Sequence, residues 1–172
     1  SDLPDPSGLA CPRGNRMDID PRLSATLYTA VLSDILDELG YRNQAMRPFL
    51  RPADESLAFI GRARTGLHAA TWTAGCVPDG LVRGLRQIRA MRFPVFHGGI
   101  GPLDTKGRAR MVEMDSAVEC GGVRVETGDV IFGDVDGVVV VPAAVASDVI
   151  ERALAKITGE NRTRAELERG AL

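Results

Sequence analysis

The sequence contains few of the residues that build disulfide frameworks and metal centres. Among its 172 residues are three cysteines and two histidines. Cys11, Cys76 and Cys120 lie far apart with no Cys-x-x-Cys spacing, a pattern typical of reduced thiols rather than of disulfides or a zinc site. Because His68 and His97 are the only histidines, a multi-histidine metal site is excluded.

The chain also lacks a large charge imbalance and any long hydrophobic run. Its formal net charge of −2 gives no electrostatic reason to bind nucleic acid or an anionic membrane. Even an apolar run such as Val138–Val141 suits one buried strand and is far too short to span a bilayer. Residues 1–10 are acidic and lack the basic start and apolar core of a signal peptide. We therefore expect a cytoplasmic protein without nucleic-acid or membrane partners.

Common catalytic motifs are missing as well. The sequence has no Gly-x-Ser-x-Gly elbow, Walker A loop, His-Glu-x-x-His or Gly-x-Gly-x-x-Gly motif. The glycine cluster at residues 98–101 is a candidate phosphate loop, but no helix signal follows it, and a tight turn explains it as well. His97, beside these glycines, either faces a pocket or is a satisfied structural histidine.

The length and pattern predict one domain after a short arm. Residues 1–22 are rich in Pro, Asp, Gly and Arg, which indicates a flexible N-terminal arm, and residues 23–172 suit a single domain with a real core. Apolar residues at helical spacing predict a first helix that ends at Gly40. Asp34, on the other side of this helix, belongs to an acidic face whose simplest interpretation is a solvated surface.

The second half of the chain mixes strands and helices. Alternating residues predict a strand within 57–66 and a half-buried strand at 110–114, whereas the segment 68–73 fits neither helix nor strand. Short valine-rich strands separated by turns follow, and the last of them ends at Pro142. An amphipathic helix then begins near Val145 and is expected to be interrupted at Gly159. This pattern predicts an α/β fold.

Residues 76–102 predict a strand, turn, helix and strand in succession. Apolar residues recur every three positions and predict a short helix with one buried stripe: Val82, Leu85, Ile88 and Met91. Ligands bind beyond the carboxyl ends of strands in α/β sheets, so the candidate site is residues 78–84. We expect Arg83 to open the helix, where a permanent cation favours an anionic or carbonyl-bearing ligand. The alternative is a surface arginine.

Four segments resemble one known family, the RraA-like family. They are PDGLVRGLRQIRAMRFPVF, GPLDTKGR, VECGGVRVETGDVIFGDVDGVVVVP and the helix into ALAKITGENRTR, within residues 29–164. The family includes the 4-hydroxy-4-methyl-2-oxoglutarate aldolases and the regulator of ribonuclease E activity. The resemblance implies a three-layer swivelling β/β/α fold related to phosphohistidine domains. It also implies homo-oligomers, either trimers or hexamers, with active sites between subunits.

The resemblance further implies where a site lies and where this sequence departs from it. In the aldolases of this family, an Arg-Asp pair opens the helix; the Asp holds Mg²⁺ or Mn²⁺ and the Arg polarises the substrate carbonyl. Arg83 matches the catalytic Arg, but Gly84 replaces the metal-binding Asp and Gln87 replaces a second carboxylate. We therefore expect no metal cofactor. The segment that carries the family's substrate loop, between Gly66 and Gly75, is absent or much shortened.

Two classes of function follow. The first is an enzyme that acts on a 2-oxo acid or another small anionic ligand. It is either of the aldolase or decarboxylase type, with Arg83 polarising the carbonyl, or a divergent, metal-independent lyase, isomerase or cyclase. Its ligand would contact a set of residues around the helix opening and one from a neighbouring subunit: Asp79, Gly80, Gly84, Gln87 and Asp34. His68 and Trp72 could line an enlarged pocket. The second class is a non-catalytic binding or regulatory protein.

Overall fold

The computed structural model describes residues 19–70, 81–104 and 109–169. The expected boundary at residue 22 falls inside a 3-10 helix. The elements in chain order are η2 (Pro21–Ala25), α1 (Thr29–Glu38), β1 (Arg51–Pro52), β2 (Phe59–Arg62), β3 (Gly66–Ala70), β4 (Leu81–Val82), α2 (Leu85–Ala90), β5 (Phe96–His97), β6 (Gly99–Ile100), β7 (Ala109–Met114), β8 (Val118–Cys120), β9 (Val123–Val125), β10 (Val130–Gly133), β11 (Val138–Val141) and α3 (Ala146–Glu168).

A three-stranded antiparallel sheet in the order β11-β10-β2 forms the centre of the fold. Val130 of β10 pairs with Val141 on one side and with Arg62 on the other. A turn closed by two backbone hydrogen bonds between Asp134 and Gly137 joins β10 to β11. The turn expected from the sequence is confirmed, as is the end of the last strand before Pro142.

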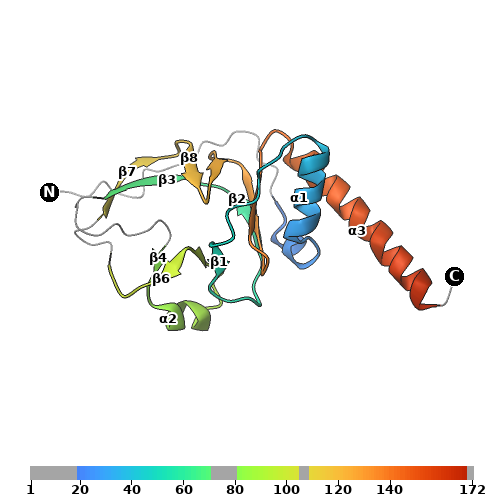
Figure 1. Ribbon diagram of the computed structural model, residues 1–172, viewed down its shortest axis with the longest axis horizontal. Helices are drawn as coiled ribbons and strands as arrows, with labels where there is room; N and C mark the ends of the chain where they lie inside the picture. Colours follow the sequence, from blue (N-terminus) through green and yellow to red (C-terminus); the bar gives the residue numbers. More distant parts are fainter. Residues whose placement is uncertain (1–18, 71–80, 105–108, 170–172) are drawn as a thin grey trace.

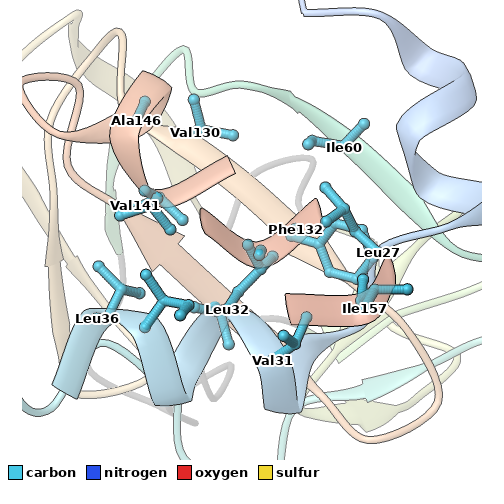
Figure 2. Packing of buried hydrophobic residues seen from close by; sticks show 14 residues of the cluster. Leu27, Val31, Leu32, Leu36, Ile60, Val130, Phe132, Val141, Ala146 and Ile157 are labelled. Carbon is cyan, nitrogen blue, oxygen red and sulfur yellow. The ribbon is translucent and has the colours of Figure 1, made fainter. Parts of the chain in front are cut away.

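Both faces of this sheet are covered. Helices α1 and α3 pack on one face, and the remaining strands lie on the other side (Figure 1). The four valines of β11 are all buried because successive side chains point to opposite faces of a strand. Val139 and Val141 join the helices' core, where Figure 2 shows Leu32, Phe132 and Val141 in one cluster, whereas Val140 packs with the β8–β9 hairpin.

Helix α1 is fixed at both ends. At its start, the Asp134 carboxylate accepts hydrogen bonds of 2.8 Å from the backbone N–H and from the hydroxyl of the buried Thr29. At its end, Gly40 has φ +84°, its N–H donates to Asp37, and the N–H of Tyr41 donates to Leu36. This is a Schellman motif, so the predicted stop at Gly40 is confirmed.

Helix α3 is longer than the sequence predicts. It runs without a break through Gly159 for 23 residues, so the expected interruption there was wrong. A glycine lowers helix stability by about 1 kcal/mol relative to alanine but does not force a break when the residues around it favour a helix. Beyond Ile157, which is buried, the helix extends past the sheet (Figure 1), and residues 158–163 are exposed.

Strands β3 and β7 form a separate antiparallel ribbon. Strand β3 covers part of the segment that fits neither pattern in the sequence. The prediction of a half-buried strand at residues 110–114 was wrong about burial, because all five residues are exposed. Met111 and Val112 are each 45% exposed. The reason is that β7 has extensive contacts only with β3 among the described elements.

The strand predicted before the turn at residues 78–80 lies outside the described residues, and the helix predicted after that turn is present but shorter than expected. Strands β4 and β6 are parallel and α2 lies between them in the chain. Val82 belongs to β4 rather than to the helix. No residue of α2 is buried, and Met91, just after the helix, is 67% exposed, so the expected buried stripe was wrong. Within α2, Leu85 and Ile88 are half-buried and the other residues are exposed.

The chain thus has a mixed α/β fold, with helices on one side of the central sheet and short strands on the other. Within the described ranges, none of the helices combines the length and apolar character that crossing a membrane requires.

Candidate functional site

The candidate site lies at the carboxyl ends of the parallel pair β4–β6. Leu81 pairs with Gly99 and Val82 pairs with Ile100, and the N–H of Gly101 donates to the carbonyl of Val82 at 3.0 Å. A Cβ added to Gly99 would lie 2.8 Å from Leu81 Cδ2, so the glycine allows close approach of the neighbouring strand. Gly99 therefore serves strand packing, and the described residues after β6, 101–104, form irregular chain rather than the helix that a phosphate loop needs.

Arg83 follows β4 directly, at the edge of the sheet where the sequence predicts a site. It does not open α2: the N-cap is Gly84, and the helix begins at Leu85. Its guanidinium Nη2 lies 3.0 Å from Oδ2 of Asp104, and the side chains are 57% and 42% exposed. The positive charge at this edge therefore comes from Arg83 itself and is partly balanced by one carboxylate.

Gly84 needs the conformational freedom of glycine. Its φ of +72° and ψ of +31° lie in the left-handed region, which L side chains rarely adopt. Gln87, one helical turn further on, is exposed, and its Oε1 lies 3.6 Å from the place where a Cβ of residue 84 would stand. Gly84 and the Gln87 side chain therefore lie close together at the start of α2.

The residues at this opening do not fit the divalent metal that the family resemblance implies. Gly84 has no side chain, and an uncharged Gln87 is a poor ligand for Mg²⁺, which prefers one or two carboxylates. Asp104 supplies a single carboxylate and already faces a guanidinium. In the part of the chain that the structure describes, no group of three or more His, Cys, Asp or Glu side chains is placed to hold a metal ion.

The other predicted site residues lie on other elements or outside the described residues. Asp79, Gly80 and Trp72 lie outside the described residues, while His68 belongs to β3. Asp34 lies on α1 and is exposed, and its carboxylate accepts a 2.8 Å hydrogen bond from Lys156 of α3. That hydrogen bond raises the pKa of Lys156 above its ordinary value. Contact of Asp34 with a neighbouring subunit's site stays a prediction.

Sequence reasoning missed Asp104, which it assigned to a polar turn. One signal was available: Arg83 follows β4 and Asp104 follows β6, so parallel pairing of these strands places both residues at one sheet edge. The contact joins residues 21 positions apart (104 minus 83), and it depends on a pairing register that the sequence pattern does not fix.

His97, the other candidate from the sequence, is buried beside α2. It pairs with Arg51 across β5 and β1 and is 9% exposed. Its Nδ1 has no hydrogen-bond partner among the described residues, so the interpretation as a satisfied histidine is not supported. Burial, and secondarily the charge of Arg89, lower the pKa of His97. Arg89 itself donates to the carbonyl of Ala53 at 2.6 Å, which holds α2 to the chain after β1.

A shallow cavity of about 270 Å³ lies elsewhere, between the start of α1 and β11. Its polar lining includes Thr29, Ser33 and Asp136. The Thr29 hydroxyl already donates to Asp134, and no site residue expected from the sequence lines the cavity.

Comparison with known proteins gives consistent matches. The family model described as RraA-like, Aldolase/RraA, matches residues 66–140. A protein of Halalkalibacterium halodurans, provisionally named 4-hydroxy-4-methyl-2-oxoglutarate aldolase, is 34% identical over 103 residues, which are 60% of this chain and 49% of that protein. An uncharacterised protein of Methanocaldococcus jannaschii is 40% identical over 96 residues, 56% of this chain and 46% of its own. The match thus spans about half the length of these relatives.

Two solved structures have a similar fold. An uncharacterised protein of Pseudomonas syringae has a TM-score of 0.74 at 22% identity, over 85% of this chain and 90% of its own. RraAS2 of Streptomyces coelicolor, described as an unusual member of the RNase ES inhibitor RraA protein family, has a TM-score of 0.71 at 19% identity, over 86% of this chain and 98% of its own. At such identities the likeness concerns the fold.

Proposed function

Because this chain belongs to the RraA-like family, we propose that it acts on a small carboxylate or 2-oxo acid bound beside Arg83. The observation that carries the proposal is the position of this side chain. Its guanidinium is more than half exposed at the carboxyl ends of two parallel strands, where α/β folds bind ligands. Gly84 follows Arg83 in the chain, and Gln87 lies close to Gly84, so both would complete the contact surface.

A guanidinium can perform the essential electrostatic work of the proposed reaction. Its planar array of N–H donors can bind a carboxylate through two hydrogen bonds, or can polarise a carbonyl and stabilise the negative charge that develops on an enolate oxygen. Since the metal-binding carboxylate is missing at Gly84, the proposed enzyme is a divergent lyase-like protein that works without a metal ion. An isomerase or cyclase would use the same interaction.

The second candidate is a non-catalytic binding or regulatory protein of the same family. Loss of the metal-binding carboxylate at Gly84 favours it, and so do large exposed apolar side chains suited to protein contacts: Phe49, Leu67, Met91, Phe93, Ile100, Leu103, Met111 and Val112. A homo-oligomer would cover part of this surface. We propose a trimer or hexamer, and a monomer in light scattering at micromolar concentration would contradict it.

The proposed layer order is that of the three-layer swivelling β/β/α fold. Helices α1 and α3, the β11-β10-β2 sheet and the β8–β9 hairpin would form its layers. An experimental structure with a ligand would test both the layer order and the site.

Ligand binding tests the function directly. Pyruvate, the simplest 2-oxo acid, is titrated into the protein and its dissociation constant measured by ligand-observed NMR. We expect Arg83→Ala to abolish binding while the free energy of unfolding changes by less than about 0.5 kcal/mol, since the site is exposed. Arg83→Lys should restore little, because a point charge cannot form the two-pronged contact. Arg64→Ala is the matched control: Arg64 is also in an exposed ion pair, with Asp115.

A turnover assay distinguishes the lyase-like enzyme from the non-catalytic binding or regulatory protein. Release of pyruvate from 4-hydroxy-2-oxo acids in buffer with a chelator supports the lyase, and binding without any turnover supports the regulatory protein. If pyruvate and related 2-oxo acids bind equally well to the unaltered protein and to Arg83→Ala, the site is not at Arg83 and the proposal is wrong.

A further inference from the structure

The guanidinium of Arg83, which would bind the proposed ligand, is already paired with a carboxylate of the protein. Asp104 Oδ2 lies 3.0 Å from Arg83 Nη2, within the distance of a charge-assisted hydrogen bond. The two charged groups do not need each other to offset the cost of burial, since their side chains are 57% and 42% exposed. Its location at the carboxyl ends of β4 and β6 is the one where a ligand is expected.

The backbone brings Asp104 to this place. The parallel register aligns Val82 with Ile100, and the hydrogen bond from Gly101 N–H to the Val82 carbonyl extends the pairing one residue beyond β6. Pro102 then restricts the backbone before Asp104. The chain after β6 therefore runs beside the chain after β4, so the contact follows from the strand pairing rather than from chance proximity of two long side chains.

We propose that Asp104 acts as an internal competitor of the anionic ligand for the guanidinium of Arg83. This inference rests on the proposed function, because it concerns the same site. In the free protein, the carboxylate of Asp104 is paired with the guanidinium of Arg83. An incoming carboxylate must take over the same N–H donors, and Asp104 must then move away.

The strength of the pair suits this role. Exposed ion pairs contribute about 0 to 1 kcal/mol, so a ligand can displace Asp104 at little cost. The competition still lowers the affinity for every anion that binds to Arg83. It thereby favours ligands that offer two oxygens to the guanidinium, such as a 2-oxo carboxylate, over weakly held single anions.

The test compares two variants with opposite expected effects. Pyruvate affinity is measured by ligand-observed NMR at low salt for the unaltered protein, Asp104→Asn and Arg83→Ala. We expect Asp104→Asn to tighten binding about two- to fivefold, the factor that corresponds to an exposed ion pair, and Arg83→Ala to abolish it. The gain should shrink in high salt, because salt screens exposed charges. Asp115→Asn, which breaks the exposed pair with Arg64, is the control and should leave affinity unchanged.

The outcomes separate this inference from the proposed function. If Arg83→Ala abolishes binding but Asp104→Asn leaves it unchanged or weakens it, Asp104 is not a competitor and the inference is overturned while the proposed function stands. If Arg83→Ala binds pyruvate as well as the unaltered protein does, or if neither binds it, the proposed function fails and the inference fails with it. Equal tightening by Asp115→Asn would indicate a general charge effect and would also overturn the inference.

Discussion

Replacement of Gly84 by alanine tests whether the helix opening depends on glycine for its backbone. The structure gives this residue φ +72°, in the left-handed region. The space around it is open, since the nearest atom to an added Cβ is Gln87 Oε1 at 3.6 Å, an ordinary contact. The cost of Gly84→Ala should therefore come from the backbone alone.

The size of the effect follows from two opposing contributions. A left-handed conformation costs an L residue roughly 1–2 kcal/mol. Alanine also lowers the conformational entropy of the unfolded chain, which stabilises the folded protein by about 0.4–1 kcal/mol. We therefore expect Gly84→Ala to lower the free energy of unfolding by roughly 1 kcal/mol. Gly84→Asp should cost less than alanine, because aspartate tolerates this conformation better.

Urea unfolding followed by circular dichroism measures both variants. Gly159→Ala is the matched control with the opposite sign: this glycine lies in the regular helix α3 with nothing within 4 Å of an added Cβ. Alanine there should stabilise the protein by about 0.5–1 kcal/mol. If Gly84→Ala leaves stability unchanged or raises it, the left-handed conformation, and the reason for glycine at this position, are wrong.

The affinity for Mg²⁺ is a second quantity to measure, both in the unaltered protein and in Gly84→Asp. Calorimetry should find no micromolar Mg²⁺ site at the helix opening in the unaltered protein, since the required carboxylates are missing there. The aspartate should raise Mg²⁺ affinity only modestly, because Gln87 still supplies no charge. A tight, stoichiometric site at this opening in the unaltered protein would refute the metal-independent proposal.

Three further predictions concern stability. Asp134→Ala removes the cap of α1 and leaves buried donors unpaired, so it should cost about 2 kcal/mol in urea unfolding, whereas exposed Asp136→Ala should stay within about 0.5 kcal/mol. Because burial lowers the pKa of His97, the unfolded chain binds its proton more readily; stability should fall as the pH drops below about 6.5, and His97→Gln should reduce this loss. Gly133→Ala places a Cβ 2.6 Å from Phe59 and should cost about 1–3 kcal/mol.

Local sequence signals predicted the elements that depend on local chemistry. The stop of α1 at Gly40 needs only a residue that tolerates positive φ, and the turn at Asp136-Gly137 needs only its own residues. The valine run of β11 was readable because a strand buried on both faces has no polar alternation. These signals recovered the strands of the central sheet and the helices beside it, but not the order in which the strands pair.

Features that depend on neighbours were missed. The periodicity around Met91 predicts a buried stripe, but burial depends on what packs against the helix, and within the described chain little does. The helix break expected at Gly159 does not occur, because the residues around this glycine favour a helix. At the candidate site, the contact between Arg83 and Asp104 could not be predicted, since it depends on the register of β4 with β6.

Strand β11 contributes to two apolar clusters, one on each of its faces, and this couples the unfolding of the layers on either side. Val139 and Val141 pack against the helical layer, while Val140 packs against β9 on the opposite face. Detaching α1 or α3 would expose one side of the strand, and detaching the hairpin would expose the other. Neither layer can leave without loosening the support of the other. The amides of β9, β10 and α1 should therefore exchange with solvent deuterium at similar free energies of opening, as one cooperative unit.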